Sequence, residues 1–314
     1  MKPLIKPVSP DVLAQDLRPA FRVCSFRGLA VMVFRGEEAP AAMREIGRIR
    51  EAAFRQVGAG RDVETDLDRR DFGPAAYCQL VVWDPIAREI VAAYRYICCG
   101  DHALEGTCAH LRTSDLFVYT DGFRRDILPN MIELGRSVVN KQSRRAALGL
   151  YATWVGLGAL LCEYPEIDGF FGNFSVYKTL PPAVIDRMLH YLQCYHAPAE
   201  PLLGAKKKLA YAARNAGQAP IPGERRAQAY AALQDLCRDE GVGLPPILLS
   251  YLGAAPDMQY LGVAHDADFG DALECAILIR RDMLDPKIRS RFLDGYQSGN
   301  RGRFAQLRHR GIRA

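Results

Sequence analysis

The chain has 314 residues, of which 49% are hydrophobic and 25% are charged, and its formal net charge is +5. This balance is typical of a globular protein with a sizeable core, and it excludes a fibre, a disordered chain and a repeat array. The small positive charge permits an acidic partner without requiring one, and it does not indicate nucleic-acid binding.

The cysteines and histidines indicate neither a disulfide framework nor a metal site. The nine cysteines are scattered, without a C-x-x-C pair, and the six histidines lack the spacing of metal ligands. We therefore expect no bound metal and a reducing, cytoplasmic setting. Residues 1–16 lack the apolar core that a signal peptide needs.

The first third of the chain predicts a strand, a helix and a hairpin. Residues 29–34 form a short apolar run, typical of a strand, and residues 38–57 carry apolar side chains at helical spacing between arginines. The polar, acidic residues 58–76 predict a loop. Residues 77–83 and 89–97 then predict a β-hairpin.

The middle of the chain contains an uncharged helix between strands. Residues 116–119 predict a short strand, and residues 132–139 a longer one that is rich in β-branched side chains. Residues 146–162 are 17 uncharged residues with three glycines. A membrane span needs about 20 apolar residues, so we expect a buried core helix here.

The last part of the chain predicts more helices and two final strands. A strand is expected at residues 169–176 and a helix at residues 182–195. Residues 205–240 read as helical and are basic at their beginning. Residues 258–263 and 273–279 predict the last two strands.

The order of these elements predicts a mixed α/β sheet with helices on its faces. A Rossmann fold is excluded because no glycine fingerprint follows the first strand. Since no change in composition marks a domain boundary, we expect residues 1–314 to form a single domain. A helical, basic insertion at about residues 200–245 would precede the last strands.

Three segments carry a resemblance to a known family. Residues 48–55 lead into a cluster of aspartates, residues 79–84 continue into residues 89–95, and residues 132–137 precede an arginine pair and the apolar helix. Together they resemble the hemolysin-like GNAT family, the bacterial ornithine-lipid and glycine-lipid N-acyltransferases. They are similar, more distantly, to long-chain N-acyl amino acid synthases and acyl-homoserine-lactone synthases.

The resemblance implies a fold, a reaction and its partners. The fold would be the GNAT fold, a mixed and mostly antiparallel sheet flanked by helices. The donor would be an acyl group on acyl carrier protein, with acyl-coenzyme A as the less favoured alternative. The acyl-phosphopantetheine would then be a co-substrate, and no cofactor would be bound. The acyl chain, often 3-hydroxylated, would pass to an amino acid and give a lyso-aminolipid. Contact with the inner membrane would be peripheral, and the identity of the amino acid stays open.

The candidate catalytic residues are Glu133, Gly135 and Arg136. Amide formation needs a neutral amine, and Glu133 is a lone carboxylate in an apolar strand, the kind of group that serves as a base. The alternative is a structural ion pair between Glu133 and Arg136 or Arg95. A bulge at Gly135 would bring Glu133 and Arg136 toward one side of the sheet and free a backbone N–H.

The residues that open the apolar helix are candidates for binding the phosphate of the donor. Backbone N–H groups and the helix dipole favour an anion there, and two arginines stand beside them. We therefore expect a pantetheine phosphate site at Arg144, Arg145, Ala147 and Gly149. The alternative is a basic helix entry that only touches solvent.

A third group of residues is expected to bind substrate. The aspartates of the polar loop are suited to the ammonium of the acceptor, the alternative being a merely solvated acidic loop. The resemblance adds two arginines and a phenylalanine. The full set is Arg50, Phe54, Asp66, Asp68, Asp71 and Arg95.

Basic spots elsewhere suit an acidic carrier protein or anionic lipid headgroups, although such runs are usually only solvated. They are Arg124, Arg125, Lys206, Lys207 and Lys208. Two other functions stay open. One is a membrane-active or lipid-binding hemolysin-like protein, which would use the apolar helix and the lysine run. The other is a synthase of the acyl-homoserine-lactone type, which the extra C-terminal third of the chain disfavours.

Overall fold

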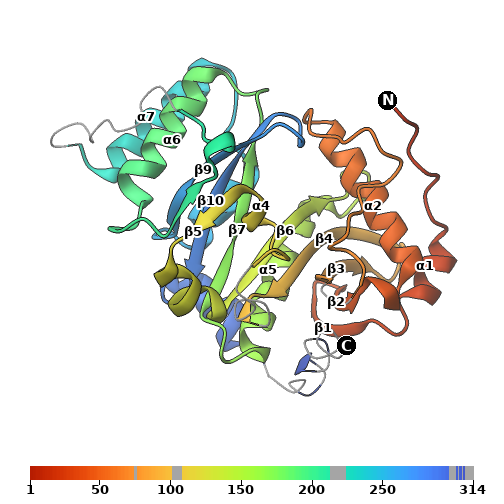
Figure 1. Cartoon of the computed structure of the whole chain (residues 1–314). Helices are drawn as coiled ribbons and strands as arrows, with labels where there is room; N and C mark the ends of the chain where they lie inside the picture. The colour runs from red at the N-terminus through yellow and green to blue at the C-terminus, as the bar shows by residue number, and fades with distance from the viewer. Residues whose placement is uncertain are drawn as a thin grey trace.

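The computed structural model describes residues 1–73, 76–100, 108–212 and 224–296, with residues 302, 304, 305 and 307. Its centre is an eight-stranded sheet in the order β1-β2-β3-β4-β6-β7-β10-β9. In Figure 1 the sheet runs from β1 and β2 beside α2 to the blue strands β9 and β10 near α6. All neighbours are antiparallel except β6 and β7, which are parallel.

The strands of this sheet are β1 (Phe21–Phe26), β2 (Leu29–Arg35), β3 (Cys78–Asp84), β4 (Glu89–Cys98), β6 (Met131–Val139), β7 (Gly169–Val176), β9 (Gln259–Asp266) and β10 (Ala272–Arg280). A small second sheet pairs β5 (Phe117–Tyr119) with β8 (Leu203–Ala205). The helices are α1 (Pro10–Asp16), α2 (Pro40–Arg55), α4 (Thr113–Leu116), α5 (Ala146–Glu163), α6 (Pro182–His196), α7 (Arg226–Asp239), α8 (Pro246–Ala254) and α9 (Pro286–Arg289).

The two faces of the sheet carry different helices. The amphipathic helix α2 buries side chains such as Met43 and Ile46 against Val81 and Ala93 on one face. The small β5–β8 sheet continues this cover over β7 and β10. Helices α5, α6, α7 and α8 share a core on the opposite face. Because side chains alternate along a strand, the face on which each residue lies follows from these two cores.

Helix α5 lies on the sheet and contacts β1, β2, β3, β4 and β6. Among the described residues it is the one helix that is long and apolar enough to cross a membrane, and 61% of its most apolar window is buried. Gly156 explains part of this close contact, because a Cβ there would come within 2.7 Å of Val31 and 2.9 Å of Leu80. The helix thus packs as part of the core, as the sequence predicted.

Most strands lie where the sequence predicted them, but the segment expected to be helical over residues 205–240 does not begin as a helix. Residues 203–205 form β8, a short 3-10 turn follows, and α7 begins at Arg226. Residues 213–223 lie outside the described part. The strand β8 depends on β5, more than 80 residues earlier, and a local pattern cannot show such a pairing.

The sheet is interrupted on both sides of the middle of β6. Toward β7, the ladder ends at the pair Leu134–Gly172, although both strands continue. Toward β4, Arg95 pairs with Gly135 and Ala93 with Val138, so two residues of β6 lie opposite Tyr94. This is a β-bulge. It was expected at Gly135 and is found one residue later, at Arg136, whose φ is 55°.

Candidate active site

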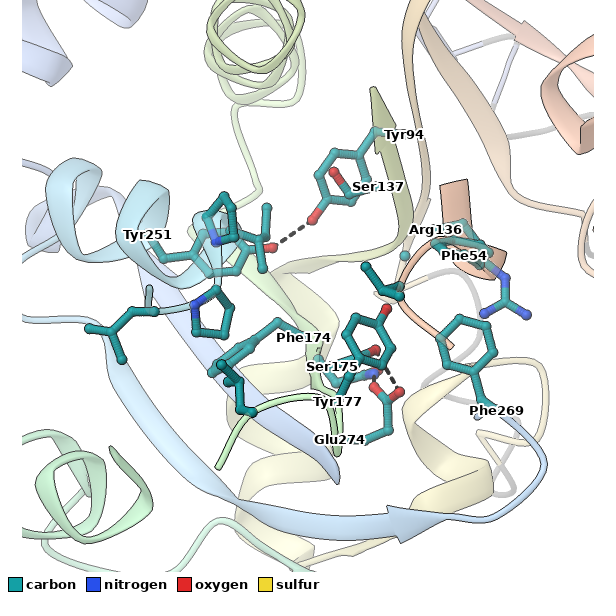
Figure 2. A pocket seen from close by; sticks show the side chains of 18 of the residues that line it. Phe54, Tyr94, Arg136, Ser137, Phe174, Ser175, Tyr177, Tyr251, Phe269 and Glu274 are labelled. Atoms are coloured by element: carbon teal, nitrogen blue, oxygen red, sulfur yellow. Dashed lines mark hydrogen bonds between the residues drawn. The ribbon is translucent and has the colours of Figure 1, made fainter. Parts of the chain in front are cut away.

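A cavity of about 380 Å³ lies where β6 and β7 stop pairing. Residues from the bulge of β6, from the end of β7 and from the start of α8 line it. Figure 2 shows Tyr94 and Tyr251 at one end and Arg136 with Phe54 and Phe269 at the other. The interrupted sheet therefore opens a passage between its own two faces.

The cavity is apolar toward one face of the sheet and polar toward the other. Phe174 belongs to the core under α5 and α8, and the apolar lining continues there with Leu244, Pro245 and Ile247. Asn173 and Ser175 flank Phe174 in β7, so they point to the opposite face. The polar end therefore lies on the side of α2 and α4, and it also receives Arg95, Arg112, Arg136 and Glu274.

Glu274 is the carboxylate at this polar end. It sits in the middle of β10, is 1% exposed, and is directly opposite Ser175. The hydroxyl of Ser175 donates to its Oε1 at 2.7 Å, and the amide of Asn173 donates to its Oε2. Burial raises the pKa of Glu274, while the Ser175 hydrogen bond and the charge of Arg112 oppose that shift.

The predicted substrate-binding residues lie together: Phe54 and Arg95 line the cavity, and the arginines and aspartates form a buried charge network beside it. Arg50 lies 2.9 Å from Asp71, and Arg95 lies 2.9 Å from Asp68 and 3.4 Å from Asp71. Burial alone would raise the pKa of both aspartates, but Arg50 and Arg95 outweigh it and hold these pKa values below the ordinary range. Gln79 completes the network by accepting from Arg50 at 2.8 Å.

Arg136 places a guanidinium at the cavity wall. It pairs with Asp66 at 2.9 Å, and its guanidinium carbon lies 4.5 Å from the ring centre of Phe269 and 5.5 Å from that of Phe54. Burial lowers the pKa of Arg136 to about 10, so it stays charged at neutral pH. Each of the three aspartates is thus engaged by an arginine. The geometry does not place them to hold an acceptor's ammonium, because none of them lines the cavity.

Glu133 is fully buried, and it does not line the cavity. Its carboxylate accepts from the backbone N–H of Arg112 at 2.9 Å and of Thr113 at 2.8 Å, and from the hydroxyls of Tyr77 and Thr113. Its described hydrogen-bond partners are these neutral donors and not the expected arginines. In this arrangement Glu133 anchors the start of α4, which carries Arg112 to the cavity, and its role as a base stays a prediction.

The expected phosphate-binding residues do not meet at the cavity. Arg144 is exposed, and Arg145 lies 3.6 Å from Asp84 and donates to the carbonyl of Arg27. Ala147 lines a separate groove with Tyr151, between α5, the end of β1 and residues 291–296. Gly149 faces the sheet, where a Cβ would lie 3.2 Å from Ala92 and Val139, so its small size serves packing.

The apolar end of the cavity holds two hydroxyls that the sequence did not single out. Those of Tyr94 and Tyr251 lie 2.6 Å apart, so one donates to the other and one proton remains for a third group. Burial raises the pKa of Tyr94 to about 12, and it also raises the pKa of Tyr251. Both are neutral phenols at physiological pH and can protonate a leaving group.

Sequence reasoning also missed Glu274, Asn173 and Ser175. Glu274 carries the same signal that drew attention to Glu133, a single carboxylate inside an apolar strand, in the run of residues 273–279. Both carboxylates are buried, and the hydrogen-bond partners distinguish them. Glu133 is held by two backbone N–H groups and two hydroxyls that do not line the cavity, whereas Glu274 is held by two side chains that line the cavity with it.

The chain is similar to known acyltransferases. Residues 49–154 match the acetyltransferase (GNAT) domain family. A glycine N(alpha)-acyltransferase of Bacteroides thetaiotaomicron is 33% identical, with 92% of this chain and 89% of that protein covered. One of Phocaeicola vulgatus is 31% identical, with 94% of each covered. The crystal structure of the AHL synthase LasI matches with a TM-score of 0.41 at 12% identity, over 86% of this chain and 98% of that one.

Proposed function

The chain has the GNAT fold and belongs to the family of these two glycine N(alpha)-acyltransferases, and on that premise we propose that it transfers a long-chain acyl group from acyl carrier protein to the α-amine of glycine. The acyl chain would be 3-hydroxylated and the product an N-acylated amino acid, the precursor of an aminolipid. The reaction would take place in the cytoplasm or at the inner face of the membrane.

The observation that carries the proposal is the cavity that passes between the two faces of the sheet. Its apolar end, toward α8, suits the acyl chain and its polar end suits a small zwitterion. The two reactants would meet where β6 and β7 part. Holding both in one geometry turns a bimolecular step into an effectively unimolecular one.

The groups around this meeting point match the needs of amide formation. Beyond Leu134 the edge of β6 is not paired with β7, so backbone N–H groups of the bulge are available to an oxyanion. Arg112 and Arg136 supply positive charge for the α-carboxylate of glycine. Tyr94 or Tyr251 would protonate the departing thiolate.

An acidic carrier protein fits the charge of this chain. The formal net charge is +5, and Arg144 is exposed at the entry of α5. Arg124 and Arg125 follow β5, and Lys207 and Lys208 follow β8, so both basic spots border the same small sheet. Attraction between such a surface and an acidic partner raises the rate of encounter. The membrane-active alternative is not favoured, because α5 packs into the core.

The test is a reconstituted reaction with defined donors and acceptors. The purified protein is given a 3-hydroxyacyl group on carrier protein or on coenzyme A, with glycine or a larger amino acid, and the products are measured by mass spectrometry. We expect N-acylglycine, with carrier protein as the better donor. A faster reaction with coenzyme A would overturn the donor, and acylation of another amino acid in preference to glycine would overturn the acceptor.

A further inference from the structure

We propose that Glu274 is the base that takes the proton from the ammonium of the acceptor, and that Asn173 and Ser175 position its carboxylate for this step. The assignment rests on the proposed function and names the residue that makes the amine reactive. It replaces Glu133, which the sequence favoured, by a carboxylate that lines the cavity.

The first argument is access. Glu274 lines the polar end of the cavity, on the face of the sheet to which Arg112 and Arg136 also point. Strand β10 is paired on both sides, with Ser175 of β7 and Ala264 of β9 directly opposite Glu274. Its backbone is therefore fixed, and its carboxylate points into the cavity, as Figure 2 shows.

The second argument is chemical state. Among the residues that the structure describes, Glu274 forms no ion pair, and its oxygens accept from the neutral side chains of Asn173 and Ser175. The aspartates nearby are paired with arginines and hold low pKa values. A carboxylate that an arginine holds ionised is a poor proton acceptor, whereas one whose pKa is raised by burial binds a proton more readily.

Several charged groups act on Glu274 from the elements packed around it. Arg112 before α4 and Arg136 of β6 favour the ionised form. Asp266 of β9 opposes them, and the pKa of Tyr177, the residue after β7, is itself raised by burial and by the charge of Glu274. Burial is the largest influence, so the balance leaves the pKa of Glu274 above that of an exposed glutamate.

The proton balance of the reaction requires such a group. The ammonium of the acceptor gives one proton to Glu274 and becomes a neutral amine. Its nitrogen bonds to the thioester carbon, and the carbon–sulfur bond breaks as Tyr94 or Tyr251 protonates the departing thiolate. The second amine proton then replaces the proton that the tyrosine gave. The products are an amide and a free thiol, and Glu274 returns its proton to water before the next turnover.

The test compares two buried carboxylates by the pH dependence of acyl transfer. Glu274→Gln keeps the shape of the side chain, and we expect kcat/KM for glycine to fall about a hundredfold or more. The acidic limb of the rate profile, measured from about pH 5 to about pH 9, should disappear. The loss of activity in Glu274→Gln should be smaller when hydroxylamine replaces glycine as the acceptor, because hydroxylamine is uncharged at neutral pH and has no proton to give up first. In the matched variant Glu133→Gln the midpoint of the acidic limb should stay where it is.

A second variant keeps the proposal testable if Glu274→Gln does not fold. Ser175→Ala removes a hydrogen bond that favours the ionised carboxylate, so the midpoint should move to higher pH. If the wild-type protein acylates glycine, the assignment of Glu274 would be overturned by an acidic limb that persists in Glu274→Gln. It would also be overturned by an acidic limb that is lost in Glu133→Gln instead. Absence of wild-type acylation would overturn the proposed function itself.

Discussion

Arg50 is the residue whose removal should most damage the folded state without touching the cavity. It is 0% exposed and bonds to Asp71 at 2.9 Å and to Gln79 at 2.8 Å. Arg50→Met keeps most of the volume and removes the charge. Breaking a buried ion pair by removing one partner costs about 3–5 kcal/mol. Because Arg95 still lies 3.4 Å from Asp71, we expect the lower end, about 3 kcal/mol.

The assay is urea unfolding followed by tryptophan fluorescence. At a slope of about 3 kcal/mol per molar, a loss of about 3 kcal/mol lowers the midpoint by roughly 1 M urea. The matched control is Arg226→Met, since Arg226 pairs with Asp257 on the surface, with side chains 41% and 74% exposed. A surface pair contributes about 0–1 kcal/mol, so this variant should unfold close to wild type. Equal midpoints for the two variants would refute the account of the network.

The same variant has a pH signature. The pKa of Asp71 is lowered in the folded protein, so its ion pairs stabilise the fold above the unfolded pKa of about 4, and that stability is lost as pH falls through the folded pKa. The difference in unfolding free energy between wild type and Arg50→Met should therefore be largest near neutral pH and narrow as the solution is made acidic. A difference that is constant with pH would contradict this reasoning.

Three further changes test other parts of the site. Gly172→Ala would place a Cβ 2.6 Å from the carbonyl oxygen of Leu134, so it should disrupt the last β6–β7 pair. We expect it to lower both acyl transfer and thermal stability. In the control variant Gly253→Ala the new Cβ meets no atom within 4 Å, and both quantities should stay unchanged. Glu133→Gln can place an amide NH₂ opposite the N–H of Thr113, so it should lower the free energy of unfolding in urea by about 1–3 kcal/mol. An unchanged midpoint would argue against the role of Glu133 in holding the start of α4. With carrier protein as donor, kcat/KM should fall steeply with added salt, because the Debye length shortens from about 10 Å at 0.1 M to about 3 Å at 1 M. A kcat/KM that does not change with salt would argue against electrostatic steering.

Local patterns predicted every strand of the large sheet except β1, because the periodicity and composition of those strands are contained within each segment. The hairpin of β3 and β4, the strand β6 and the helix α5 are all visible in this way. β8 is not, because it exists through its pairing with β5. α8 was missed for a related reason, since its short apolar run reads equally well as a strand, and its place is set by the core that it completes.

The candidate site was predicted in part, and the missing part depends on contacts between distant segments. The sequence singled out Arg95 and Arg136, which line the cavity, and a bulge in β6, which the structure has one residue later. It singled out Glu133 and missed Glu274, although both are single carboxylates in apolar strands. Only the folded chain distinguishes them, by bringing the Arg112 and Thr113 backbone to Glu133 and a cavity to Glu274.

The proposed reaction joins an acyl chain to the nitrogen of glycine, and isotope labelling in cells tests this proposal. Cells that overproduce the protein are fed isotopically labelled glycine, and their lipids are extracted and analysed by mass spectrometry against cells that overproduce Glu274→Gln. We expect a new N-acylglycine lipid that carries the label in the wild-type cells and is strongly reduced in the variant. A new lipid without the label, or no new lipid in cells that contain folded wild-type protein, would contradict it.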